Sequence, residues 1–171
     1  MRVAITDASF KHSLALATYL KRFDSTLALS GIHPKPLRLP SLYKRHYHTL
    51  INGNLEDIVA KHDFDLVIPV GNQSVETLSK IRYPYAVLPS PWALDIALSK
   101  AKTLHFAKNL DVPVPQTFSL GDAYSIPYPL VVKGSQEAGK NLVSYVFSPD
   151  ELNNAFETIQ KDPSQKGALP M

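Results

Sequence analysis

The architecture of this chain is clearest in two nearby stretches: SKAKTLHFAKNLDVPVPQTFSL (residues 99–120) and YPLVVKGSQEAGKNLVSYVFSPDELNNAF (residues 128–156). In the first, a helix-period segment begins at a lysine and leads to a Val-Pro-Val-Pro exit. In the second, an apolar strand ends in another lysine, and a loop of small residues leads into a second strand and a helix. We therefore predict a hairpin with a helix packed on it. The predicted elements are a helix over 100–109, strands over 130–132 and 142–146, and a helix over about 150–160.

The preceding ninety residues have a different pattern, in which short apolar runs alternate with helix-period segments. Continuous apolar strands separated by helices indicate a parallel sheet that is covered on both faces. Asn54 is predicted to cap one of the helices, because Glu56 and Asp57 follow it in the first turn. The segment from His33 to Leu50 carries three prolines and is predicted to be a loop. The predicted strands are 3–6, 26–29, 66–70 and 85–88, and the predicted helices are 13–20, 54–62 and 75–81.

The fold class is therefore α/β, in two parts that meet between Ser90 and Lys100. We place the first domain at residues 1–95 and the second at residues 96–171. A hydrophobic share of 44% supports a core, and the absence of cysteine excludes disulfides and thiolate catalysis. No apolar run approaches membrane-spanning length and the N-terminus has no signal-peptide layout, so we expect a cytoplasmic protein with no membrane partner. A net charge of +3 is too modest to predict a nucleic-acid partner.

Two lysines are the main candidates for chemistry. Lys133 ends an apolar strand and precedes the small-residue loop 134–140, whose glycines, Gly134 and Gly139, let backbone N–H groups approach an anion. Lys100 begins a helix, where its charge opposes the helix dipole, which favours a role toward a ligand. Each has a plainer alternative that stays open, since Lys133 could merely end a strand and Lys100 could be a solvated surface residue.

Taken together, these features resemble the ATP-grasp superfamily, whose members include biotin carboxylase, D-alanine–D-alanine ligase and the large subunit of carbamoyl-phosphate synthase. In that superfamily a basic residue opens a helix, a Gly-Val-Pro-x-Pro-like exit follows, and a second lysine ends an apolar strand. The spacing to Pro113 favours Lys100 over Lys102 as the first basic residue. The matching segments are Lys100, 111–115, 128–133, 134–140, 142–146 and 148–152.

The resemblance implies a function. Family members use ATP and Mg²⁺ to phosphorylate a carboxylate, and an amine or similar nucleophile attacks the acyl phosphate. By resemblance, the ATP contacts would be Lys100, Lys133, Gly134, Ser135 and Gly139. The first domain resembles the Rossmann-like pre-ATP-grasp domain, and residues 66–72 and 88–91 look like segments of carbamoyl-phosphate-synthase-like members.

The sequence also departs from the family pattern. The loop 134–140 has fewer glycines than is usual, and Asn72 stands where an acidic residue is common. The family's Mg²⁺ ligands lie far downstream of the matched segments, so no metal ligand and no catalytic residue is assigned in this chain. We therefore expect an N-terminal fragment comprising the pre-ATP-grasp domain and half of the ATP-grasp domain. We expect it to be inactive alone. Exposed apolar surface would favour a homodimer, but the sequence leaves the oligomeric state open.

Two further groups of residues leave other functions open. Asp7, Ser9, Lys11 and Ser13 follow the first strand, where ligands bind in parallel α/β sheets, and they are candidate contacts for an acidic substrate; ordinary helix capping is the alternative. The chain could then be a non-catalytic Rossmann-like module that binds a small anion or a protein partner. The basic-aromatic segment from Tyr43 to His48 could instead be an interaction patch.

Overall fold

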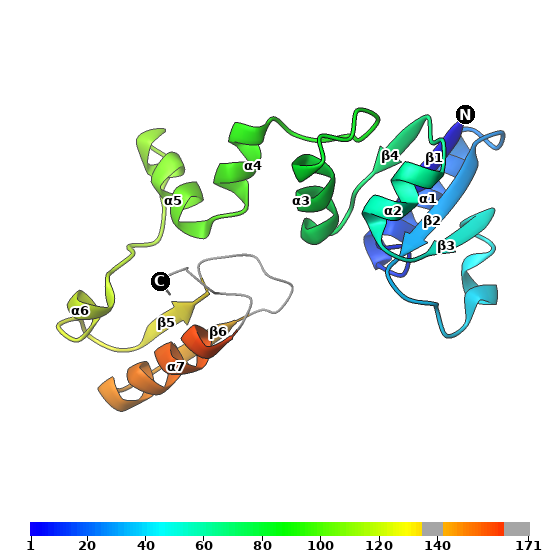
Figure 1. The fold of residues 1–171 in the computed structure, drawn as a ribbon. Coiled ribbons are helices and arrows are strands. Elements are labelled where there is room, and N and C mark those ends of the chain that lie inside the picture. Colours follow the sequence, from blue (N-terminus) through cyan, green and yellow to red (C-terminus); the bar gives the residue numbers. More distant parts are fainter. Residues whose placement is uncertain (135–141, 163–171) are drawn as a thin grey trace. The chain divides into compact units, whose positions relative to one another are not determined.

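The computed structural model describes residues 1–134 and 142–162 (Figure 1). The chain divides into two compact units, Met1–Pro89 and Ser90–Met171. The first contains a parallel sheet flanked by helices, and the second contains helices and an antiparallel hairpin, which confirms the predicted α/β class. Within the two described ranges, no helix has both the length and the apolar character to cross a membrane.

The first unit is built on four parallel strands in the order β3-β2-β1-β4. The central strand β1 pairs with β2 on one side and with β4 on the other, and β3 extends the sheet beyond β2. A strand that is covered on both faces of its sheet must be apolar, and Val3, Ala4 and Ile5 are fully buried. The strands are β1 (Arg2–Ile5), β2 (Ala28–His33), β3 (Thr49–Asn52) and β4 (Leu66–Ile68).

Helices cover both faces of this sheet, as the continuous apolar strands predicted. On one face, Val3 and Ile5 pack in a cluster with Ala17 of α1. On the other, Ala4 packs in a cluster with Ile58 of α2 and Leu78 of α3. The alternation of neighbouring β1 residues between the two clusters follows from the two-residue period of a strand. The helices are α1 (Lys11–Phe23), α2 (Leu55–Lys61) and α3 (Asn72–Lys80), and a 3-10 turn, η1, spans Pro40–Tyr43.

The predicted strands are corrected in two places. Thr49–Asn52, whose first two residues fall in the predicted loop, forms β3. The segment 85–88, predicted to be the fourth strand, makes only an isolated bridge between Ala86 and Val67. The N–H of Val67 donates to the carbonyl of Tyr85, and the N–H of Val87 donates to the carbonyl of Val67, so pairing begins here without continuing into a strand.

The predicted cap of α2 is confirmed. The Asn54 side-chain oxygen accepts hydrogen bonds from the backbone N–H groups of Glu56, at 2.8 Å, and Asp57, at 3.3 Å. These are two of the N–H groups that a helix start leaves without an intrahelical acceptor. Glu56 and Asp57 also place negative charge in the first turn, where the helix dipole favours it.

The second unit contains the predicted hairpin and its helix. Strands β5 and β6 are antiparallel, with Leu130 opposite Val146 and Lys133 opposite Val143. The helix α7 packs on one face of this pair, and the buried core joins Val132 and Val146 to Leu152, Ala155 and Ile159. The elements are α4 (Pro91–Ala97), α5 (Lys100–Asn109), α6 (Leu120–Ala123), β5 (Leu130–Lys133), β6 (Val143–Val146) and α7 (Pro149–Lys161).

Candidate functional site

A cleft of about 670 Å³ opens within the second unit. Its walls come from α5, from the segment between Pro115 and Leu120, from β5 and from α7. Most of the lining side chains are apolar, and the two predicted lysines both border the cleft. The lining includes Lys100, Leu104, Phe118, Val131, Lys133 and Phe156.

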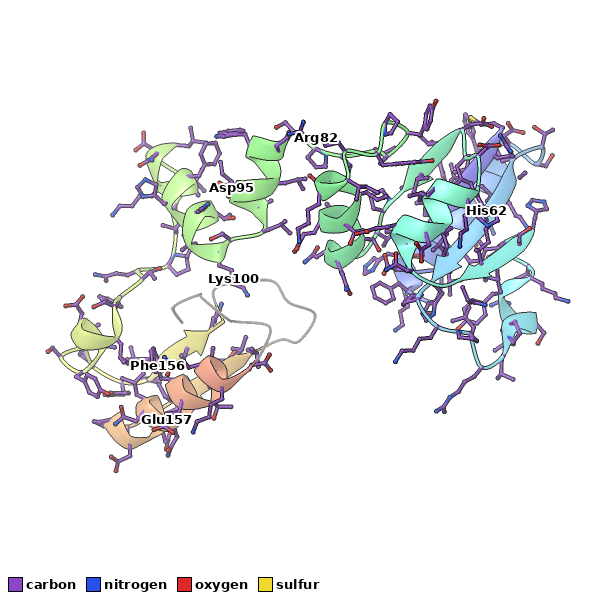
Figure 2. The ribbon with its side chains drawn as sticks, in the orientation of Figure 1. His62, Arg82, Asp95, Lys100, Phe156 and Glu157 are labelled. Carbon is purple, nitrogen blue, oxygen red and sulfur yellow. The ribbon has the colours of Figure 1, made fainter. Side chains whose placement is uncertain are left out.

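Lys100 is held at the end of β5 where Lys133 lies. The Nζ of Lys100, which is labelled in Figure 2, donates a hydrogen bond to the carbonyl oxygen of Gly134 at 2.9 Å, and Gly134 directly follows Lys133 in the sequence. The start of α5 is fixed by Ser99, whose hydroxyl accepts the N–H of Lys102. A lysine at the first position of one helix thus reaches the end of a strand over thirty residues away. The structure therefore brings Lys100 and Lys133 to a shared cleft.

The other predicted loop contacts have different outcomes. The N–H of Gly134 donates to the carbonyl of Leu142 at 2.9 Å, which extends the hairpin by one hydrogen bond beyond the last strand pair. Ser135 and Gly139 lie outside the described residues. Lys102, the competitor of Lys100, does not line the cleft, and its Nζ lies 2.6 Å from the carboxylate of Asp95.

The chemistry of this cleft is that of a binding site. Apolar walls from Leu104 and Val131 suit a flat, weakly polar group, and the lysines supply two positive charges. Ammonium groups bind phosphate oxygens as point charges, so a pair of them suits a polyphosphate. Among residues 1–134 and 142–162, no three His, Asp or Glu side chains gather closely enough to hold a metal ion.

The four candidates in the first unit have separate surroundings. Asp7 has a left-handed backbone, with φ of 53°, and its carboxylate accepts hydrogen bonds from the Thr6 hydroxyl at 2.5 Å and from the Gly71 N–H at 2.8 Å. Ser13 is fully buried, and its hydroxyl donates to the Thr6 carbonyl at 2.9 Å. Both side chains join the segment directly after β1 to its surroundings, Asp7 to the start of α3 and Ser13 to α1.

Ser9 and Lys11 face other partners. The Ser9 hydroxyl lies 3.0 Å from Nε2 of His33, which sequence reasoning left unassigned. The remaining ring nitrogen of His33, Nδ1, lies 2.6 Å from the carbonyl oxygen of Lys35. His33 ends β2, the strand beside β1, so only the sheet order could have placed it next to Ser9. Lys11 lines a separate groove on the surface of α1.

The segment from Tyr43 to His48 is not the continuous exposed patch that its composition indicates. Tyr47 is 1% exposed, and its hydroxyl donates to the carbonyl of Ala8 at 3.2 Å. Burial, and to a smaller extent Tyr43, raises the pKa of the Tyr47 phenol well above its usual value. His48 accepts the N–H of Leu29 through Nδ1 at 3.1 Å, and so helps to tie β3 to β2. The interpretation of Tyr47 as part of a surface patch is therefore wrong.

His46 has a polar environment of its own. Its Nδ1 lies 2.8 Å from the Thr18 hydroxyl oxygen, and its Nε2 accepts the Nε–H of Arg45 at 2.9 Å. Desolvation lowers the pKa of His46, and the positive charges of Arg45 and Lys21 lower it further. His46 and His48 thus contact different segments.

Solved structures with a similar fold include the following two. The first is the biotin carboxylase domain dimer of a 2-oxoglutarate carboxylase from Hydrogenobacter thermophilus, in complex with MgADP, ADP and bicarbonate. It matches 92% of this chain, with a TM-score of 0.67 and a sequence identity of 13%. The second is N5-carboxyaminoimidazole ribonucleotide synthetase from Thermus thermophilus; the TM-score is 0.62 and the identity 18%, over 95% of this chain. This chain spans 40% and 44% of their respective lengths. No protein-family model matches the sequence, and no curated protein matches it. At these identities the likeness establishes the fold alone.

Proposed function

We propose that this chain is the N-terminal part of an ATP-dependent carboxylate–amine ligase of the ATP-grasp kind, which works through an acyl phosphate. The observation that carries the proposal is the contact of Lys100 with Gly134, which holds the first lysine beside the second at one cleft. The fold likeness supports it, because the Hydrogenobacter domain was crystallised with MgADP and bicarbonate.

In this proposal each part of the cleft has a role. Lys100 and Lys133 bind phosphate oxygens and stabilise the charge that develops as the terminal phosphate is transferred. The apolar walls, including Leu104 and Val131, bind the base. The Gly134 N–H already donates to the Leu142 carbonyl, so any backbone N–H contacts to the phosphates would come from Ser135 and Gly139, which lie outside the described residues. Mg²⁺ would neutralise the phosphate oxygens, and its ligands would come from outside the described residues.

ATP titration by calorimetry tests the proposal. We expect Lys133→Met and Lys100→Met each to weaken ATP binding about tenfold, because each removes a charged contact worth about 1.5 kcal/mol. Lys102→Met is the matched control, since Lys102 lies on the same helix and pairs with Asp95 outside the cleft. Equal losses in Lys100→Met and Lys102→Met, or no ATP binding by the unaltered chain, would contradict the assignment.

The rival function, a non-catalytic module that binds a small anion in the first unit, has less support. The Asp7 carboxylate accepts the N–H of Gly71, which is the N-cap residue of α3, so a negative charge of the protein itself already occupies that helix start. A likeness to carbamoyl-phosphate synthase in particular, and association as a homodimer, remain predictions. Light scattering of the purified chain tests the second of these.

A further inference from the structure

A second groove, of about 460 Å³, lies on the first unit and is unrelated to the nucleotide cleft. Its floor is formed by one side of α1, and the segment from Arg45 to His46 borders it. The floor is largely apolar, with Leu14, Ala15 and Tyr19 as its main surfaces. Three cationic side chains line the groove as well: Lys11, Arg22 and Arg45.

Positive charge is concentrated at this groove. Residues 1–89 contain eleven Lys and Arg against seven Asp and Glu, a net charge of +4, whereas the whole chain carries +3, so residues 90–171 are slightly acidic. Lys21 adds a fourth cation beside the groove, since its Nζ donates to the Arg45 carbonyl at 3.2 Å. Among the described residues, no carboxylate lines the groove, and Lys11, Arg22 and Arg45 form no ion pair.

Exposed aromatic rings continue the floor along α1. Tyr19 is 64% exposed and Phe23 is 79% exposed, and the two rings stack with centroids 6.5 Å apart. They lie one helical turn apart, so they share a side of α1 with Ala15. Large apolar side chains that stay exposed next to each other, with polar residues around them, are typical of interaction surfaces.

The rim of the groove is partly fixed in place. Thr18 donates its hydroxyl proton to the Leu14 carbonyl at 2.8 Å, so its oxygen accepts the Nδ1–H of His46. His46 then accepts the Nε–H of Arg45 through Nε2. This chain of hydrogen bonds positions the guanidinium of Arg45 beside α1, and its terminal nitrogens can still donate to a carboxylate. A pre-positioned cation loses less side-chain entropy when it binds.

We propose that this groove binds an acidic peptide segment of a partner protein. Its aliphatic or aromatic side chains would pack on Leu14, Ala15 and Tyr19, and its carboxylates would pair with Lys11, Arg22 and Arg45. A second copy of the chain is disfavoured, because a symmetric contact through this face would bring the same cations together. A single strand of nucleic acid is disfavoured because such strands stack on several separate rings, whereas Tyr19 lines the groove and the neighbouring Phe23 ring stacks on Tyr19 itself.

Fluorescence anisotropy tests the proposal with a fluorescein-labelled peptide of Glu, Leu and Phe, about twelve residues long, which is long enough to span α1. We expect saturable binding that weakens about fivefold in Arg22→Gln and in Tyr19→Ala, because each removes one direct contact. Lys61→Gln is the matched control, since it makes the same charge change on α2, away from the groove. A second peptide, with Leu and Phe replaced by Ser and all carboxylates kept, should bind more weakly.

Several results would overturn the proposal. One is an equal loss in Lys61→Gln and Arg22→Gln, which would mean general charge attraction. Another is equal binding of the two peptides, which would mean that the apolar floor contributes nothing. Tighter binding of a poly-uridine oligomer, or of vesicles that contain phosphatidylserine, would assign the groove to nucleic acid or to a membrane surface. Lys133→Met should leave peptide binding unchanged, so a failure here is distinct from a failure of the nucleotide proposal.

Discussion

The two units of this chain have similar lengths but different architectures. The first surrounds a four-stranded parallel sheet with helices and has a buried cluster on each face. The second has two strands, one helix packed on them and a core of six buried residues among those described, beside an open cleft of about 670 Å³. Two-stranded sheets are only marginally stable unless a helix covers them. If the proposed function holds, stability is concentrated in the first unit and nucleotide binding in the second.

The polar side chains show the same difference. In the first unit the polar groups near the strand ends bind one another, as Asp7 binds Gly71, Ser13 binds Thr6 and Tyr47 binds Ala8. Such contacts stabilise a fold and leave little for a ligand. In the second unit, Lys133 and Lys100 border an apolar cleft, and the Lys100 Nζ also donates to the Gly134 carbonyl there. Substitutions in each unit can test this division of roles, beginning with those of the largest expected effect.

Core truncations should separate the two units. Leu29→Ala in β2 and Ile159→Ala in α7 each remove a fully buried side chain, at a cost of about 2–5 kcal/mol. The first unit keeps a second buried cluster when one is weakened, whereas the described part of the second unit has one cluster. We therefore expect Ile159→Ala to unfold the second unit and to abolish ATP binding, while Leu29→Ala leaves a weakened but folded chain.

Hydrogen exchange measures this difference strand by strand. In Ile159→Ala, amide protection should be lost in β5 and β6 and retained in β1 and β2. Loss of protection in all four strands at once would show that the units unfold together, and the proposed division would then be wrong.

Glycine substitutions should distinguish a crowded position from an open one. A methyl group at Gly31, in β2, would lie 2.9 Å from the Ala8 Cβ and 2.9 Å from Cγ of Tyr47. Neither atom can move easily, so Gly31→Ala should destabilise the first unit by about 1–3 kcal/mol. Gly121→Ala in α6 is the matched control, because the nearest atom there is the Ser119 hydroxyl oxygen at 3.9 Å. Urea unfolding should show no loss for Gly121→Ala, and equal losses for both would refute the packing argument.

Tyr47 should make the first unit sensitive to alkali. Because burial raises the pKa of this phenol in the folded chain, the unfolded chain ionises first as the pH rises past about 10. The free energy of unfolding should then fall by up to about 1.4 kcal/mol per pH unit from this group alone. At pH 8, Tyr47→Phe should be about 1 kcal/mol less stable than the unaltered chain, because the hydrogen bond to Ala8 is lost. That gap should shrink above about pH 10, and a gap that does not change with pH would contradict the prediction.

Hydrophobic pattern predicted the parallel sheet and its two-sided cover, and cap chemistry predicted the start of α2. The features that these patterns did not predict depend on contacts with residues that are far away in the sequence. β3 begins at Thr49, directly after a basic and proline-rich segment, and its pairing with β2 is not visible in its own residues. Tyr47 lies among Lys44, Arg45 and two histidines, so its neighbours suggest a surface position although the ring is in the core. In the second unit the two lysines were found by motif, but their shared cleft needed the contact from Lys100 to Gly134.

The smallest expected effects come from two helix caps, one in each unit. The Asn54 side chain accepts the Glu56 and Asp57 N–H groups at the start of α2. The Ser148 hydroxyl accepts the Glu151 N–H at the start of α7, at 3.3 Å, and the Glu151 carboxylate accepts the Phe147 N–H at 2.8 Å. Replacing either cap by Ala should cost about 1 kcal/mol.

Because the two substitutions are expected to cost about the same free energy of unfolding, their effects show directly how much stability each unit has to lose. In the larger core of the first unit, Asn54→Ala should lower the urea midpoint slightly and leave ATP binding unchanged. In the second unit the same loss is a larger fraction of the total, so Ser148→Ala should also weaken ATP binding measurably. Ser148→Asp restores an acceptor at the helix start and should recover both properties. If Asn54→Ala weakened ATP binding as much as Ser148→Ala, the nucleotide site would depend on the stability of both units, and stability and binding could not be assigned to separate units.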